Sequence, residues 1–298
     1  MGINVSELNF LFLCQRRGVD FSRVLMMGRQ SLNLSKETLQ KMLLDQGITK
    51  TSLEIDQIVG DGFSEGLFKF VFGAKVVDSV DASNHENASI VHDMNYPLKI
   101  RKKYSAVIDF GCLEHVFNFP MAIDSLVESC KTNGHILHAL PANNSCGHGF
   151  YQFSPELFFS LYSSKRGFDQ TSVFLVEISK PKFWYKVVST LVLRKRVNVV
   201  NSCETYCMVL TRKLKKSATA SSKPPEQSDY LAIWKKRNKA TEQMIWTMRE
   251  RFKKVMGALG LLTPIRLILI NVKKKPNLLG GNRTDVFRME ISKLIGRG

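Results

Sequence analysis

A repeated alternation of short aliphatic runs with helical segments constrains the fold of this chain more than any other feature. Five runs of β-branched and aliphatic residues, most of them ending in polar or glycine-containing turns, occur at 22–31, 74–83, 88–95, 104–116 and 135–144. After the first run, Ser35 starts a segment with apolar residues at helical spacing that stops at Gly47. Alternation of this kind predicts a mainly parallel sheet with helices on both faces.

Two later runs, 168–191 and 197–213, predict a sixth and a seventh strand, with antiparallel pairing at that edge. We therefore predict an α/β fold with a Rossmann-like, seven-stranded, mostly parallel sheet and a basic helical C-terminal extension. The Ser/Lys/Pro-rich composition of 213–229 is typical of a linker. It divides the chain into an α/β domain over 1–212 and a basic amphipathic region over 230–298.

The formal net charge of +17 is distributed unevenly. Residues 211–298 hold 21 of the 43 lysines and arginines but only 6 acidic residues, whereas the first 210 residues are nearly balanced. The tail is therefore suited to bind phosphates or to stay solvated, while the α/β domain attracts its ligands without a strong overall field.

The six cysteines lack the regular spacing of a disulfide framework or a zinc ribbon, which indicates free thiols in a reducing compartment. The start of the chain has no secretory signal pattern. The apolar stretch 259–272 is interrupted by Pro264 and Arg266 and is shorter than the roughly 20 residues of a membrane-spanning helix. We expect a cytoplasmic protein.

Small and acidic residues recur where the predicted strands end, which is where ligands bind in such sheets. Gly28 follows the aliphatic residues of the first run, where a missing side chain lets the backbone approach a ligand. Asp81 ends the second run, in the position of an acid that accepts hydrogen bonds from ribose hydroxyls. Asp93, with Met94 beside it, follows the third run and can accept from an adenine amino group. Each acid has a structural alternative as a turn residue, but their succession favours a nucleoside site.

The fourth run ends in Asp109, Phe110 and Gly111, which we expect next to the reacting centre. The fifth run leads into the loop 141–153, which is rich in small residues, amides and one histidine. Ser154 and Pro155 then predict the start of a helix. Loops at this edge of a sheet usually determine specificity.

All six histidines lie between His85 and His148, but no two of them share a helix face at metal-binding spacing. We therefore predict no metal site.

Four strings resemble the motifs of class I S-adenosylmethionine-dependent methyltransferases, in a bacterial group that often accompanies glycan or surface-polysaccharide biosynthesis: VLMMGRQ, SVDASNHENASIVHDMNYPL, FGCLEHVFNFP and PANNSCGHGFYQFSPELF. The resemblance covers about residues 20–210, and GHGFYQFSPELF is its most specific part. The first motif departs from the usual pattern, because its acidic residue and three glycines are reduced to Gly28.

The resemblance implies S-adenosylmethionine as cofactor and a sugar, glycan precursor or other small molecule as methyl acceptor. The implied cofactor contacts are Gly28 at the methionine part, Asp81 at the ribose, Asp93 and Met94 at the adenine, and Phe110 and Gly111 at the sulfonium, with Ala82 as a further cofactor-binding residue. A base is needed for a hydroxyl or a protonated amine, and His148 is the first candidate and His115 the second. Tyr151 is expected to orient the acceptor.

Within the tail, 243–259 has apolar residues on one helical face and Arg and Lys elsewhere. This pattern is typical of a helix on an anionic membrane surface, at the inner face of the membrane, or of a helix docked on its own domain. Nucleic acid is the less favoured partner, because the tail has no known reader motif. Two alternative functions remain, a catalytically inactive binding or scaffold protein and an RNA methyltransferase.

Overall fold

The computed structural model describes residues 2–193, 196–215, 220, 223–228, 230 and 286–290. The chain divides into two compact units, one of Met1–Val187, Cys203–Pro225 and Val286–Gly298, the other of Val188–Ser202 and Glu226–Asp285. In the second unit the described residues include helix α7 (Thr190–Leu193). The amphipathic helix predicted within 243–259 lies outside the described residues.

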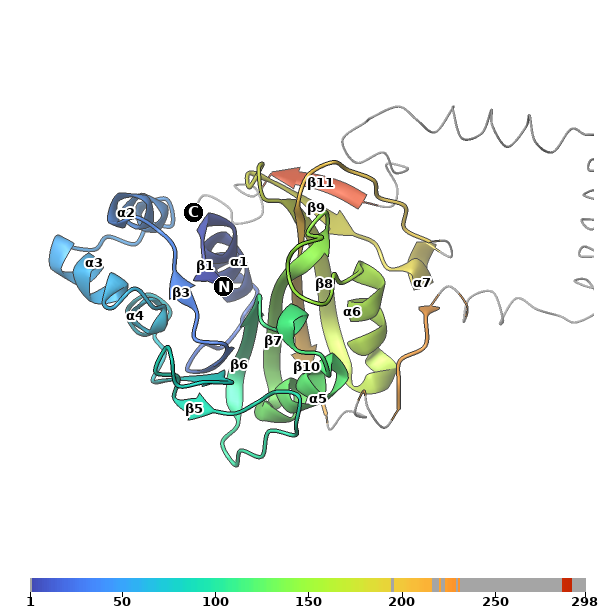
Figure 1. Ribbon diagram of the computed structural model, residues 1–298. Coiled ribbons are helices and arrows are strands. Elements are labelled where there is room, and N and C mark those ends of the chain that lie inside the picture. The colour runs from blue at the N-terminus through green and yellow to red at the C-terminus, as the bar shows by residue number, and fades with distance from the viewer. Residues whose placement is uncertain are drawn as a thin grey trace, which may run out of the picture. The chain divides into compact units, whose positions relative to one another are not determined.

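A nine-stranded sheet forms the centre of the first unit, in the order β11-β9-β8-β10-β7-β6-β2-β4-β5 (Figure 1). Its strands are β2 (Arg23–Met27), β4 (Val76–Asp81), β5 (Ile90–Val91), β6 (Tyr104–Phe110), β7 (Cys130–Asn143), β8 (Phe168–Glu177), β9 (Phe183–Val187), β10 (Thr205–Lys213) and β11 (Val286–Glu290). Neighbours from β5 to β7 pair in parallel, and β10 pairs antiparallel with both β7 and β8.

The predicted Rossmann-like sheet is thus confirmed over seven strands, with antiparallel pairing at the expected edge. Strands β9 and β11 extend it further, each antiparallel to its neighbour. Strand β6 is buried along its whole length, as is typical of a parallel strand covered on both faces. A separate parallel pair joins β1 (Gly2–Ile3) to β3 (Ser31–Leu32).

Helices cover both faces of the sheet. They are α1 (Val5–Arg16), α2 (Lys36–Leu44), α3 (Ser52–Val59), α4 (Glu65–Phe70), α5 (Phe119–Ser129) and α6 (Pro155–Leu161), with the short 3₁₀ helices η1 (Leu113–His115) and η2 (Ser164–Arg166). Leu137 and Ala139 of β7 join the core that contains α1 to α4, whereas His138 between them packs its ring against Phe158 of α6. No described helix is long and apolar enough to cross a bilayer.

Side-chain caps explain where several helices begin. Asn4 and Glu7 form a capping box at α1, in which Glu7 Oε2 accepts from the Asn4 backbone amide at 3.1 Å. The predicted cap Ser35 accepts from the Thr38 amide at 3.2 Å. Ser154 precedes α6 as predicted, with Pro155 in the first turn, but its side chain makes no capping hydrogen bond.

A buried polar network joins the sheet to α6. Asp109 Oδ2 lies 2.8 Å from His138 Nδ1, and His138 Nε2 lies 2.7 Å from the Tyr162 hydroxyl. Because a carboxylate only accepts, Nδ1 carries a proton toward Asp109. The side chains of Asp109 and His138 are fully buried, so the network needs each of its partners.

Replacing Tyr162 by Phe is expected to destabilise the fold by about 1–3 kcal/mol, because it leaves His138 Nε2 buried without a partner. Tyr104→Phe is the matched control. Tyr104 is also buried, but its hydroxyl donates to Asp78, which also pairs with Lys102 near the surface. Urea unfolding measures both variants, and equal losses of stability would contradict this assignment.

Candidate functional site

The order of the strands reverses between β2 and β6. From β2 the chain proceeds to β4 and β5 on one side, and then returns to β6 and β7 on the other. Ligands of open α/β sheets bind at such a switch point, outside the carboxyl ends of the strands. Gly28 follows β2, Asp81 ends β4, Asp93 follows β5 and Phe110 ends β6. The structure therefore brings these predicted residues to one edge of the sheet.

Gly28 and Asp81 lie on adjacent strands at this edge. Gly28 has a φ of 69°, which a residue with a side chain rarely adopts, and its amide donates to the Val80 carbonyl at 2.7 Å. Asp81 is half-buried, and its Oδ1 accepts from the Ser83 amide at 3.2 Å. Among the described residues, no hydrogen bond to its other carboxylate oxygen is found. The neighbouring Ala82 is exposed.

Asp93 stabilises a turn, which is the structural role that the sequence leaves open as the alternative to a ligand contact. Its Oδ1 accepts from the backbone amide of Asn95 at 2.9 Å and from the Asn95 side-chain amide at 2.8 Å. Asn95 Oδ1 in turn accepts from the Asn118 amide before α5. Met94 beside it is buried. This loop is therefore attached by hydrogen bonds to the start of α5.

Arg29, which the sequence patterns did not single out, holds the loop after β2. Its guanidinium pairs with Asp61 at 2.7 Å and with Glu65 at 2.8 Å, and lies 3.8 Å from the ring centroid of Phe63. A further bond reaches the Glu86 carbonyl in the loop after β4. Ion pairs thus order the loop in which the usual glycine motif is missing.

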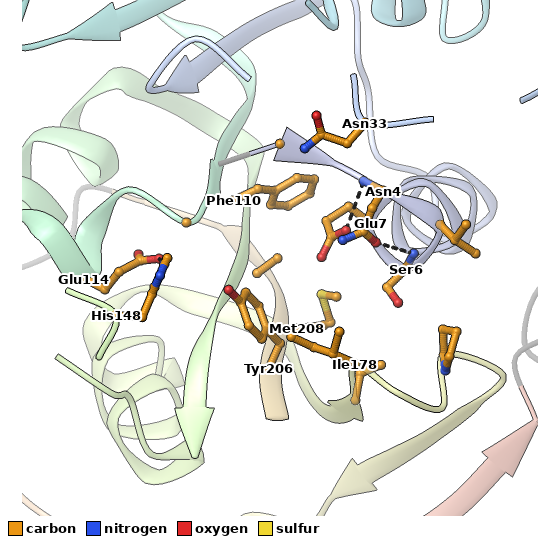
Figure 2. A pocket seen from close by; sticks show the side chains of 16 residues that line it. Asn4, Ser6, Glu7, Asn33, Phe110, Glu114, His148, Ile178, Tyr206 and Met208 are labelled. Atoms are coloured by element: carbon orange, nitrogen blue, oxygen red, sulfur yellow. Dashed lines mark hydrogen bonds and ion pairs between the residues drawn. The ribbon is translucent and has the colours of Figure 1, made fainter. Parts of the chain in front are cut away.

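A cavity of about 380 Å³ opens beside the switch point (Figure 2). The segment before and within α1 forms one wall, the β6–η1 turn and His148 form another, and strands β7, β8 and β10 contribute the apolar residues. The lining residues are Gly2, Asn4, Val5, Ser6, Glu7, Asn33, Phe110, Gly111, Glu114, Ala139, His148, Val176, Ile178, Pro181, Tyr206 and Met208. Phe110, Gly111 and His148 belong to the predicted site, whereas Gly28, Asp81 and Asp93 lie outside this lining.

Two buried acids face this cavity. Burial raises the pKa of Glu7 to about 7, against the hydrogen bonds from backbone amides. Burial and the charge of Asp109 raise the pKa of Glu114 to about 8. Burial, together with the charges of Glu114, Glu204 and Glu7, raises the pKa of Tyr206 to about 12. Shifts of this kind cluster at functional sites.

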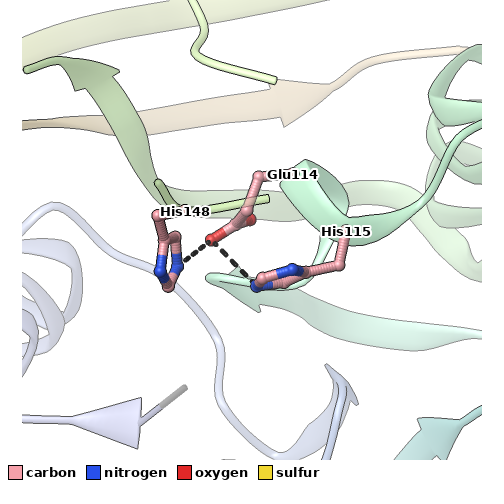
Figure 3. Close-up of side chains that lie close together, drawn as sticks. All are labelled: Glu114, His115 and His148. Atoms are coloured by element: carbon pink, nitrogen blue, oxygen red, sulfur yellow. Dashed lines mark ion pairs between the residues drawn. The ribbon is translucent and has the colours of Figure 1, made fainter. Parts of the chain in front are cut away.

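Glu114 is the centre of a cluster with His115 and His148 (Figure 3). Its Oε1 lies 3.4 Å from His148 Nε2 and 3.9 Å from His115 Nε2, and the two imidazole rings are 5.0 Å apart. The Glu114 side chain is fully buried, and neither carboxylate oxygen has a hydrogen-bond partner among the described residues. No sequence pattern indicated this contact, because the two histidines come from separate loops.

The backbone fixes His148 against Glu114. The Glu114 carbonyl accepts from the amides of Phe150 at 2.6 Å and Tyr151 at 3.3 Å. Gly149 lies between them and His148 with a φ of +71°, and a Cβ there would come within 2.7 Å of the Glu114 carbonyl oxygen. Only glycine allows the loop to lie this close.

Tyr151 is placed differently from the two histidines. Its hydroxyl donates to the Phe117 carbonyl at 2.7 Å, and its ring packs against Phe119 and Phe153. Tyr151 is outside the cavity lining and supports the loop that carries His148.

No family model and no curated protein sequence matches this chain. Among solved structures, the chain is similar to the N-methyltransferase NodS of Bradyrhizobium japonicum in complex with S-adenosyl-L-homocysteine, at 11% identity and a TM-score of 0.37 over 71% of this chain and 89% of that one. It is also similar to a possible histamine N-methyltransferase of Thermotoga maritima, at 13% identity and a TM-score of 0.36 over 71% and 92%.

Magnesium protoporphyrin IX methyltransferase of Synechocystis, with bound S-adenosylmethionine, gives 11% identity and a TM-score of 0.33 over 72% of this chain and 86% of that one. Because all three TM-scores are low, the fold of this chain is assigned from its own strand order and not from its likeness to these structures.

Glu7→Gln is expected to change how stability depends on pH. Because the pKa of Glu7 is raised from 4.5 to about 7, the unfolded chain loses this proton first, and the free energy of unfolding falls as pH rises through that window. Between a pH below 4.5 and a pH above 7, the titration of Glu7 lowers the free energy of unfolding by about 3 kcal/mol in total. Glutamine keeps an acceptor for the Asn4 amide but does not titrate, so urea unfolding at pH 5 and pH 8 should show a smaller decline.

Glu54→Gln is the control, since Glu54 occupies the same capping-box position at α3 but its side chain is 40% exposed, and hydrogen bonds lower its pKa to about 2. The stability from Glu54 is lost only as pH falls toward 2, so its variant should keep the wild-type change between pH 5 and pH 8. An unchanged decline in Glu7→Gln would refute the burial argument.

Gly149→Ala is expected to cost about 1–3 kcal/mol, because a side chain is strained at this φ and meets the Glu114 backbone. Gly147→Ala in the same loop should be nearly neutral, since a Cβ there meets no atom within 4 Å. Thermal unfolding gives the melting temperature of each variant. Similar melting temperatures for Gly149→Ala and Gly147→Ala would contradict the close approach of Gly149 to the Glu114 carbonyl.

Proposed function

We propose that this chain is an S-adenosylmethionine-dependent methyltransferase that acts on a small polar acceptor such as a sugar or glycan precursor. The observation that carries the proposal is the cavity of about 380 Å³ at the switch point of the sheet, bordered by Phe110 and Gly111. Two cofactor residues suggested by the sequence, Gly28 and Asp81, lie at the ends of β2 and β4, and β2 is the neighbour of β6, which ends in Phe110.

The residues present fit this cofactor. Gly28 follows β2 and Gly111 follows the neighbouring strand β6, with φ values of 69° and 90°, and neither residue has a side chain of its own to cover the backbone where the cofactor would lie. Asp81 would hold the ribose hydroxyls and Asp93 the adenine amino group, and Met94 beside Asp93 is buried. When bound, the cofactor supplies an electrophilic methyl group on a positively charged sulfur.

The cavity is suited to a neutral, hydroxyl-rich acceptor. Asn4, Ser6 and Asn33 offer hydrogen bonds, while Met208 and Val176 contribute an apolar wall. None of the described residues in the lining is lysine or arginine. A phosphate group is therefore not expected to enter, whereas a sugar ring has both the polar edge and the apolar face that these walls require.

The protein contributes alignment and proton handling. Methyl transfer is an in-line displacement, and holding the two reactants in line can lower the barrier by several kcal/mol. The acceptor hydroxyl is proposed to lie against Glu114 and His148, the polar cluster that faces the cavity. A proton acceptor held at this position assists the loss of the hydroxyl proton.

An inactive binding or scaffold protein is the alternative. Two buried acids with raised pKa values in one cavity cost folding free energy, and natural proteins accept such costs mainly at functional sites. This favours a functional site at the cavity.

Asp81→Asn is expected to weaken S-adenosylmethionine binding about tenfold, as one charge-assisted hydrogen bond to the ribose is lost. Asp78→Asn is the control, because Asp78 lies on the same strand but accepts from the Tyr104 hydroxyl. Calorimetric titration measures both. The proposal fails if the wild-type chain binds no cofactor.

His148→Ala is expected to lower turnover by about 10²- to 10⁴-fold while cofactor affinity stays unchanged. His85→Ala is the control, since His85 is exposed in the loop after β4. Release of S-adenosylhomocysteine, with a panel of sugars and lipid-linked glycans as acceptors, provides the assay. Full turnover of His148→Ala would remove this residue from the mechanism.

A further inference from the structure

We propose that Glu114, His115 and His148 bind a divalent transition-metal cation at the wall of the acceptor cavity. The sequence patterns predict no metal site, because no two histidines share a helix face at metal-binding spacing. The site instead arises from two loops that the sheet brings together, the η1 turn after β6 and the loop after β7.

The spacing of the three side chains fits a shared cation. One ligand atom from each lies within 4.8 Å of the others, and the two distances to Glu114 Oε1 are 3.4 Å and 3.9 Å. Ligands about 2.0–2.2 Å from a tetrahedral cation stand roughly 3.3–3.6 Å apart. Small rotations of His115 and His148, whose side chains are 43% and 44% exposed, close this difference.

Glu114 supplies an independent indication. Its side chain is fully buried, both of its oxygens lack a hydrogen-bond partner among the described residues, and it faces the cavity. A buried carboxylate without a partner is costly. The contact with His148 at 3.4 Å lacks hydrogen-bond geometry, so it does not relieve this cost. A cation bound between Glu114 and the two histidines would offset this cost.

The backbone around the cluster is held in place. Asp109 Oδ1 accepts from the amides of Cys112 and Leu113 at the start of η1, which positions Glu114 and His115. The Phe150 amide donates to the Glu114 carbonyl, and Gly149 permits that approach. Supporting contacts of this kind are typical of metal sites, where they orient the ligands.

The donor set indicates the class of cation. Two imidazoles and one carboxylate suit Zn²⁺, Mn²⁺, Fe²⁺ or Co²⁺ better than Mg²⁺ or Ca²⁺, which prefer oxygen ligands. Three protein ligands leave positions open toward the cavity, as in catalytic sites.

Resting on the proposed function, the role of the cation would be to bind the acceptor hydroxyl and lower its pKa, so that the hydroxyl proton passes to solvent water before the oxygen takes the methyl group from the sulfonium. His148 then acts as a ligand instead of a base.

The test is calorimetric titration of the full chain, stripped with a chelator, with MnCl₂ and separately with ZnCl₂. We expect one saturable site per chain. His115→Ala, His148→Ala and Glu114→Gln should each weaken binding more than about 100-fold, beyond the usual effect of losing a supporting contact. His85→Ala and His92→Ala, which remove histidines outside the cluster, should bind like the wild type.

Absence of saturable binding to the wild type, or unchanged affinity in the three ligand variants, would overturn the proposal. Circular dichroism checks that each variant is folded, and the exposure of both histidines favours tolerance of alanine. S-adenosylmethionine titration of the same samples separates the two proposals. Cofactor binding without metal binding rejects only the cation, and metal binding without cofactor binding rejects only the methyltransferase.

Discussion

Asp109 is the residue on which both the sheet and the candidate site depend. One of its oxygens caps the turn after β6 through the amides of Cys112 and Leu113, and the other bonds to His138 of the neighbouring strand. That turn sets the position of Glu114, and the charge of Asp109 contributes to the raised pKa of Glu114. A buried carboxylate with three partners is strongly constrained, so it can impose its geometry on the next residues of the chain.

Much of the fold could be predicted because its signals are local. Alternating aliphatic and helical segments revealed the parallel strands, and residues at strand ends were placed correctly at one edge, since parallel strands share that edge. Ser35 could be recognised as a helix start for the same reason. Strand β11 could not be predicted in this way, because it pairs with β9, a distant segment of the chain, and no local sequence pattern indicates which two segments pair.

The site was less predictable than the fold. The sequence indicated His148 and His115 separately, but their contact through Glu114 depends on the close approach of Gly149, which no pattern indicates. Glu7 has the sequence context of an ordinary capping residue, and only the packing of α1 over the sheet makes it a buried acid. The sequence predicts Asp93 at the adenine, and the structure shows that Asp93 also stabilises a turn through its hydrogen bonds with Asn95.

We propose that one edge of the sheet holds a methyl donor beside an acceptor cavity. A crystal structure of the chain soaked with S-adenosylhomocysteine tests this arrangement. We expect the ribose at Asp81, the homocysteine along the backbone at Gly28, and the sulfur directed past Phe110 and Gly111 toward the cavity that contains Glu114 and His148. A ligand bound elsewhere, or an edge that stays empty at saturating ligand, would contradict it.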